Sequence, residues 1–119
     1  MIAASLYQKA DLYRATDGEL LRTAEYRHSV RSLSFSPDGA ILGAGQSYYG
    51  VIPTNAADGT ELQQLPGGYD NVLAFAPDGE SVATGNREEI GWVWRADGGE
   101  PVATLEHPGA GWMVDLAFS

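Results

Sequence analysis

Short segments in which large apolar side chains alternate with small or polar ones recur along the chain. Three of them, at 30–35, 71–75 and 113–119, share a Leu-x-Phe pattern that places both large side chains two positions apart. Successive residues of a strand point to opposite faces, so each pattern predicts a β-strand with one face in a core. No segment has a convincing helical period, and the pattern predicts an all-β fold.

Asp-Gly pairs punctuate these segments at regular intervals. They stand at 17–18, 38–39, 58–59, 78–79 and 97–98. Asp-Gly favours tight hairpins because glycine accepts positive φ and the aspartate side chain bonds to nearby backbone amides. Only the pairs at 38–39 and 78–79 follow a proline. The two kinds of turn alternate, which indicates a unit of about 40 residues containing two hairpins.

Each unit is expected to be a four-stranded antiparallel meander. Segments of small residues at 41–45 and 81–85, matched by 2–5, follow the first kind of turn and suit a strand held closely between neighbouring sheets. A third strand is predicted at 10–13 and 90–94, and a fourth is exemplified by 19–23.

These motifs resemble the WD-repeat (WD40) β-propeller family. The similar stretches are Val-Arg-Ser-Leu-Ser-Phe-Ser-Pro-Asp-Gly at 30–39, Phe-Ala-Pro-Asp-Gly at 75–79 and Trp-Arg-Ala-Asp-Gly at 94–98. The family's Trp-Asp pair appears here as Tyr13-Arg14 and Trp94-Arg95, and the middle unit has no equivalent at 52–55. Only Glu106-His107 is similar to the family's Gly-His position, so its buried hydrogen-bond network is expected to be incomplete.

The resemblance implies β-propeller blades, with strands a to d counted outwards from the channel. Residues 1–25 would supply strands b, c and d of a first blade, 26–65 a second blade, 66–105 a third, and 106–119 strand a of a fourth. Three blades form an incomplete ring, because propellers close with about four to eight. We therefore expect a homodimer that closes a six-bladed ring by strand exchange, or completion by another propeller fragment of a longer protein.

Composition narrows the range of partners. The 119 residues carry 7 Lys and Arg against 16 Asp and Glu, for a net charge of −9, which repels phosphate backbones and argues against nucleic acid. The apolar runs are far shorter than the ~20 residues of a membrane span. No secretory signal pattern opens the sequence, so the cytoplasm is the expected location.

Candidate catalytic and metal-binding groups are sparse. The sequence has no cysteine and two histidines, which excludes thiolate chemistry and sulfur-based zinc sites. The acidic turns at 17–19 and 58–61 lack the ligand spacing of calcium loops. His28 and His107 stand outside any nucleophile or phosphate-loop motif, so we expect no catalytic site, no metal and no cofactor.

The loops between strands d and a and between b and c share one rim of a propeller, and they collect most of the tyrosines. The candidate partner-binding residues on this rim are Tyr7, Tyr26, Arg27, His28, Tyr48, Tyr49, Tyr69, Arg87, His107 and Trp112. Tyr, Trp and Arg dominate binding hot spots because they bury a large area while keeping a polar end. Some of these rings would alternatively only cap the blades, and Trp92 and Trp94 are expected in the core.

The sequence thus favours a non-catalytic interaction or scaffold module that presents an aromatic rim to a protein or peptide. The alternative is a purely structural set of blades in a larger sensor or signalling propeller, without a ligand of its own. An enzymatic or metal-binding role ranks third, because fold alone does not fix function.

Overall fold

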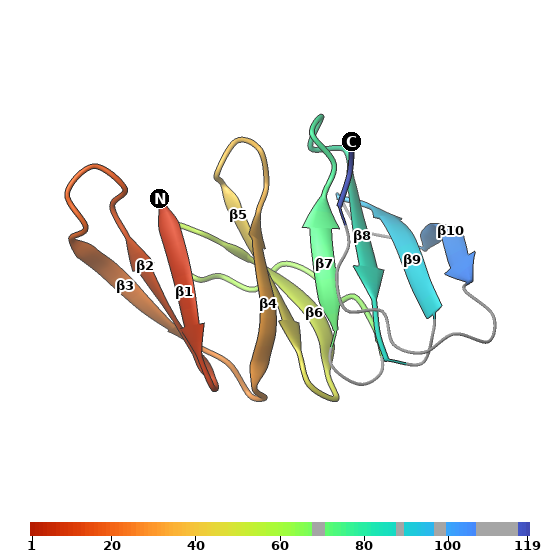
Figure 1. Ribbon diagram of the computed structural model, residues 1–119, viewed down its shortest axis with the longest axis horizontal. Helices are drawn as coiled ribbons and strands as arrows, with labels where there is room; N and C mark the ends of the chain where they lie inside the picture. Colours follow the sequence, from red (N-terminus) through yellow and green to blue (C-terminus); the bar gives the residue numbers. More distant parts are fainter. Residues whose placement is uncertain (68–70, 88–89, 97–99, 107–116) are drawn as a thin grey trace.

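The computed structural model describes residues 1–67, 71–87, 90–96, 100–106 and 117–119. Ten strands form three antiparallel sheets, and the described residues contain no helix (Figure 1). The sheets stand side by side in the order of the sequence, and they meet through their first strands. These are β1 (Ile2–Leu6) against β4 (Val30–Phe35), and β4 against β7 (Val72–Phe75). The all-β prediction is confirmed.

The first sheet is the meander β1–β2 (Lys9–Tyr13)–β3 (Leu20–Glu25). The second has the order β4–β5 (Ile41–Gln46)–β6 (Gly50–Asn55). The third follows β7 with β8 (Ser81–Gly85), β9 (Ile90–Arg95) and β10 (Pro101–Glu106), and it alone has four regular strands among the described residues.

The Asp-Gly turns have the geometry that the sequence predicts. Gly18, Gly39, Gly59 and Gly79 have φ between 74° and 79°, in the left-handed region that glycine enters at no steric cost. In the turn after β4, Asp38 Oδ1 accepts hydrogen bonds from the Ala40 amide at 3.0 Å and the Ser36 hydroxyl at 2.7 Å. The fifth turn, at 97–98, lies outside the described residues.

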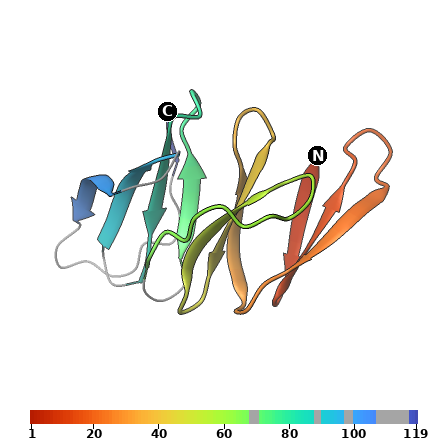
Figure 2. The same cartoon turned by 180° about the vertical axis from the view of Figure 1, so that it is seen from behind.

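The second sheet departs from the expected four strands. Its predicted fourth strand is reduced to two isolated bridges, Val51 with Leu65 and Thr54 with Glu61. Figure 2 shows the segment after β6 running without a strand along the outer side of this sheet. The physical reason is Pro53 in β6, which has no N–H to donate and so interrupts the ladder with an outer strand.

Two apolar clusters fill the spaces between the sheets. Leu12, Ala24, Leu42 and Ala56 lie between the first and second sheets, and Val51, Leu65, Leu73, Val82 and Trp94 lie between the second and third. The buried Trp94 indole donates to Thr84 Oγ1 at 2.8 Å, as expected for a core tryptophan, whereas Trp92 is half-buried.

The expected Leu-x-Phe core is only partly buried. Leu73 is 5% exposed, but Leu33, Phe35 and Phe75 are half-buried. Phe118 is 37% exposed, and residues 117–119 form no strand. Most of the predicted strand at 113–119 lies outside the described residues.

Candidate partner-binding surface

The β1–β2 turn, the β5–β6 turn and the β3–β4 loop lie at one end of the molecule, and the β2–β3 and β4–β5 turns lie at the other (Figure 1). Backbone hydrogen bonds join the loops at the first end. The Val30 amide donates to the Tyr7 carbonyl at 2.7 Å, and the Ser47 amide donates to the Ser29 carbonyl at 2.9 Å. The first two sheets therefore hold these loops in fixed relative positions.

Three predicted rim residues come together here. The His28 and Tyr49 rings stack with centroids 5.1 Å apart and an angle of 28°. The Arg27 guanidinium lies 5.8 Å from the centroid of the same tyrosine ring, and its NH1 donates to the Tyr49 hydroxyl at 3.4 Å. Tyr49 is anchored through its carbonyl, which accepts from Gln64 Nε2 at 2.7 Å. One tyrosine ring thus orders an arginine and a histidine from another loop.

Two further tyrosines project from the same end. Tyr7 is 78% exposed and Tyr48 is 68% exposed. In the described part of the chain, they are also the two non-glycine residues with positive φ, 53° and 66°. Such residues cost free energy in the left-handed region, and they persist where the surrounding turn enforces them. We call Tyr7, Arg27, His28, Tyr48 and Tyr49 the tyrosine surface.

Of the remaining predicted rim residues, the structure describes Tyr26 and Arg87. Tyr26 is half-buried against the cluster between the first and second sheets, and burial raises the pKa of its hydroxyl. Arg87 is exposed after β8 on the third sheet, and Tyr69, His107 and Trp112 lie outside the described residues. Sequence reasoning missed Arg31, whose Nε donates to Ser47 Oγ at 2.8 Å beside the tyrosine surface. The signal in the sequence was its position at the start of β4, directly after the loop at 26–29.

The described residues offer little for catalysis. They contain no group of three or more His, Asp or Glu side chains placed to hold a metal ion. His28 stacks on Tyr49, and within the part of the chain that the structure describes its ring forms no hydrogen bond to a hydroxyl or a carboxylate. None of the described segments is a helix long and apolar enough to cross a membrane.

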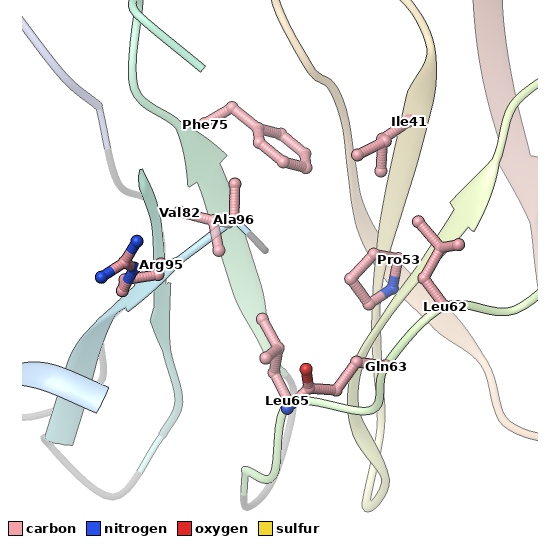
Figure 3. A pocket seen from close by; sticks show the side chains of 9 residues that line it. All are labelled: Ile41, Pro53, Leu62, Gln63, Leu65, Phe75, Val82, Arg95 and Ala96. Atoms are coloured by element: carbon pink, nitrogen blue, oxygen red, sulfur yellow. The ribbon is translucent and has the colours of Figure 1, made fainter. Parts of the chain in front are cut away.

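A cavity of about 330 Å³ lies between the second and third sheets, and the sequence analysis did not anticipate it. Its walls are mostly apolar, and Figure 3 shows the side chains that face it from both sheets. The cavity adjoins the segment that replaces the missing outer strand. The sequence feature that could have indicated this cavity is Pro53, because it lies where the repeat predicts a regular strand and it cannot donate a hydrogen bond to an outer strand.

The strand order, the turns and the stacking of the sheets are those of WD40 β-propeller blades, and the resemblance that the motifs indicated is confirmed at the level of the fold. The WD40 repeats of RRP9 superpose with a TM-score of 0.79 at 18% identity, covering 92% of this chain and 36% of that chain. A structure of U3-55K gives the same values.

In sequence, the chain is 32% identical over 91 residues to a Kluyveromyces lactis protein, the probable cytosolic iron-sulfur protein assembly protein 1. The match covers 66% of this chain and 27% of that protein. The chain therefore spans about a quarter of this relative and about a third of the structural neighbours. No protein-family model matches it.

Proposed function

We propose that the chain is a non-catalytic interaction module in which WD40 blades present the tyrosine surface to a protein or peptide. The observation that supports this proposal most strongly is the ordered group of Arg27, His28 and Tyr49. The exposed rings of Tyr7 and Tyr48 flank this group. Tyrosine and arginine bury a large area at low entropic cost when they are already held in place. The cytosol is the proposed location, since the relative's name describes a cytosolic assembly protein.

The test is a selection of peptides from a random display library on the wild-type chain, followed by affinity measurements. We expect the double variant Tyr7→Ala, Tyr48→Ala to bind the selected peptides at least ten-fold more weakly. The matched control is Tyr13→Ala, which removes a tyrosine near the Asp-Gly turns. Peptides that bind all three proteins equally well would refute the tyrosine surface as the binding site.

We further propose that another chain completes the propeller. The edge of β1 pairs with no described strand, and Ile2 and Leu6 on it are 53% and 72% exposed. Such an edge is a template for pairing with a further strand. A second copy would supply one through residues 113–118, giving a six-bladed dimer. The alternative is a larger propeller in which these blades have a purely structural role and the remaining blades come from elsewhere.

Sedimentation of the intact chain and of a variant lacking residues 112–119 separates these possibilities. Strand exchange predicts a dimer that becomes monomeric or aggregates after the deletion. A soluble monomer of the intact chain, or a dimer that the deletion leaves unchanged, would rule out exchange through this strand.

A further inference from the structure

The tyrosine surface contains an arginine whose charge is not neutralised by any carboxylate of the described residues. Lys9 and Arg14 each form an ion pair with a carboxylate. Arg27 forms none within the part of the chain that the structure describes, and its side chain is exposed. This arginine therefore offers a positive charge to a ligand.

The guanidinium of Arg27 is held in a geometry that suits a carboxylate. Its Nη1 donates to the Tyr49 hydroxyl, and its carbon lies over the ring of the same tyrosine. Among the described residues, Nε and Nη2 donate to no partner. These two atoms form the side edge of the guanidinium, which binds both oxygens of one carboxylate through parallel hydrogen bonds. Because Tyr49 already orders the group, little further entropy is lost on binding.

The two turns that carry the exposed tyrosines are tied to the loop of Arg27. Gln8 Nε2 donates to the Arg27 carbonyl at 3.0 Å, which fixes the turn between β1 and β2. The His28 amide donates to Gln46 Oε1 at 3.2 Å, which fixes the end of β5. An anion-binding edge and two exposed aromatic rings thus belong to one rigid surface.

The charges at this end of the molecule are mainly positive. The described loops at 7–8, 26–29 and 47–49, with the adjoining strand ends, contain the cations Lys9, Arg27 and Arg31 and the single carboxylate of Glu25. Lys9 pairs with that carboxylate at 3.5 Å. The net charge of the whole chain is −9, so the tyrosine surface has the opposite sign to the protein.

The acidic field from the other end of the molecule reaches this surface only weakly. Strand β4 has six residues, which at ~3.3 Å per residue separate its two ends by about 20 Å. The described Asp-Gly turns lie at the far end (Figure 1). The Debye length is about 8 Å at physiological ionic strength, so salt screens the turn carboxylates over this distance. The local cations therefore decide which ligand is attracted, and they attract an anion.

A peptide suits this surface better than a nucleic acid, which is also an anion. Proteins that bind nucleic acids neutralise several successive phosphates with lysines and arginines. The described part of this surface has three cations, and one of them is already paired with Glu25. One or two carboxylates beside an apolar group match the charges and the tyrosine rings more closely.

We propose that the tyrosine surface binds an acidic segment of another protein. A glutamate or aspartate carboxylate of that segment pairs with the side edge of Arg27, and a neighbouring aromatic side chain packs on Tyr7 or Tyr48. This inference rests on the proposed function and names the chemistry of its partner.

The first test compares three peptides by isothermal titration calorimetry on the intact chain. The probe is Glu-Glu-Gly-Phe-Gly-Glu-Glu, and the other two carry glutamine or lysine in place of every glutamate. We expect the glutamine version to bind at least ten-fold more weakly and the lysine version not to bind. Raising sodium chloride from about 50 to 300 mM should weaken the probe several-fold and leave the glutamine version unchanged. Equal binding of the glutamate and glutamine versions, or no binding of the probe at millimolar concentration, would overturn the proposal.

The second test places the carboxylate on the molecule. Arg27→Gln removes the charge and the side edge, and it should weaken probe binding at least ten-fold. The matched control Arg14→Gln changes the net charge equally in the turn between β2 and β3, and it should leave the affinity unchanged. Arg27→Lys keeps the charge but loses the paired N–H groups, so its affinity should lie between those of the wild type and Arg27→Gln. Circular dichroism and thermal unfolding verify that the variants fold, and equal affinities of Arg27→Gln and Arg14→Gln would contradict the proposed pairing.

Three outcomes separate this inference from the proposed function. Library peptides that need Tyr7 and Tyr48 but show no enrichment in acidic residues would overturn the acidic ligand and leave the binding surface in place. Probe binding that Arg27→Gln abolishes and the Tyr7→Ala, Tyr48→Ala variant leaves unchanged would refute the tyrosine rings as contacts, while the acidic ligand of Arg27 would stand. Tighter binding of an oligothymidylate of about eight nucleotides than of the probe would overturn the peptide in favour of a nucleic acid.

Discussion

Replacement of Gly45 by alanine should separate the second and third sheets. Gly45 lies in the buried strand β5, and a Cβ atom there would collide with the backbone carbonyl oxygen of Asn71 and lie 2.6 Å from Ser32 Oγ. Backbone cannot move aside as a flexible side chain can. The same collision would disturb the bond from the Ser32 hydroxyl to the Asn71 carbonyl, 3.2 Å long.

The expected loss for Gly45→Ala is about 0.5–4 kcal/mol. Overpacking costs about 1–3 kcal/mol and a lost hydrogen bond about 0.5–1.5 kcal/mol. These losses are offset by about 0.5–1 kcal/mol, because alanine is the better residue within a strand. Gly43→Ala is the matched comparison, since its Cβ would meet the Leu73 side chain, which can rotate.

Urea unfolding followed by circular dichroism measures both free energies. We expect Gly45→Ala to be less stable than Gly43→Ala, with the slope of the transition unchanged. A Gly45→Ala variant that is as stable as the wild type, or more stable, would refute the close approach of the two sheets.

Two further predictions concern buried and turn hydrogen bonds. Thr84→Val should lower the free energy of unfolding by about 1–3 kcal/mol, because it leaves the buried Trp94 indole N–H without its acceptor. The control Thr23→Val removes a hydrogen bond on the exposed face and should cost less. Equal losses of the two variants in urea unfolding would contradict this prediction. The Ser36 hydroxyl and then the Ala40 amide hold the pKa of Asp38 below its ordinary value of 3.8, so the ionised carboxylate stabilises the fold above that pH and the effect is lost as the pH falls through the lowered pKa. Asp38→Asn should therefore be less stable than the wild type at pH 7, and the difference should shrink below pH 4; a difference that is constant with pH would show that the ionised form is not favoured.

The turns and most strands were predictable because their causes are local. An Asp-Gly pair fixes a turn through its own side chain and its own φ, and alternation fixes which residues of a strand share a face. The segments at 41–45 and 81–85 became β5 and β8, both nearly completely buried between other strands. Runs of small residues, which mark strands that lie close to other strands, can be recognised in the sequence without knowing which strands are the neighbours.

The features that the sequence did not predict all depend on how neighbouring strands and sheets meet. The predicted outer strand of the second sheet satisfies the hydrophobic pattern, but it needs hydrogen bonds from β6 that Pro53 cannot donate. Tyr26 belongs to a rim loop by sequence, yet the first two sheets bury its ring. The stack of His28 on Tyr49 joins residues of different loops, and their contact depends on how the first and second sheets meet.

The acidic character of the chain has a structural origin as well as an electrostatic effect. Four turn aspartates, Asp17, Asp38, Asp58 and Asp78, each accept at 2.9–3.0 Å the amide two residues later. These carboxylates gather at one end because the repeat places the four described Asp-Gly turns there (Figure 1). The tyrosine surface, with Arg27 and His28, lies at the opposite end. A repeat that uses aspartate to close its turns therefore concentrates these carboxylates at the end of the molecule that lies away from Arg27 and His28.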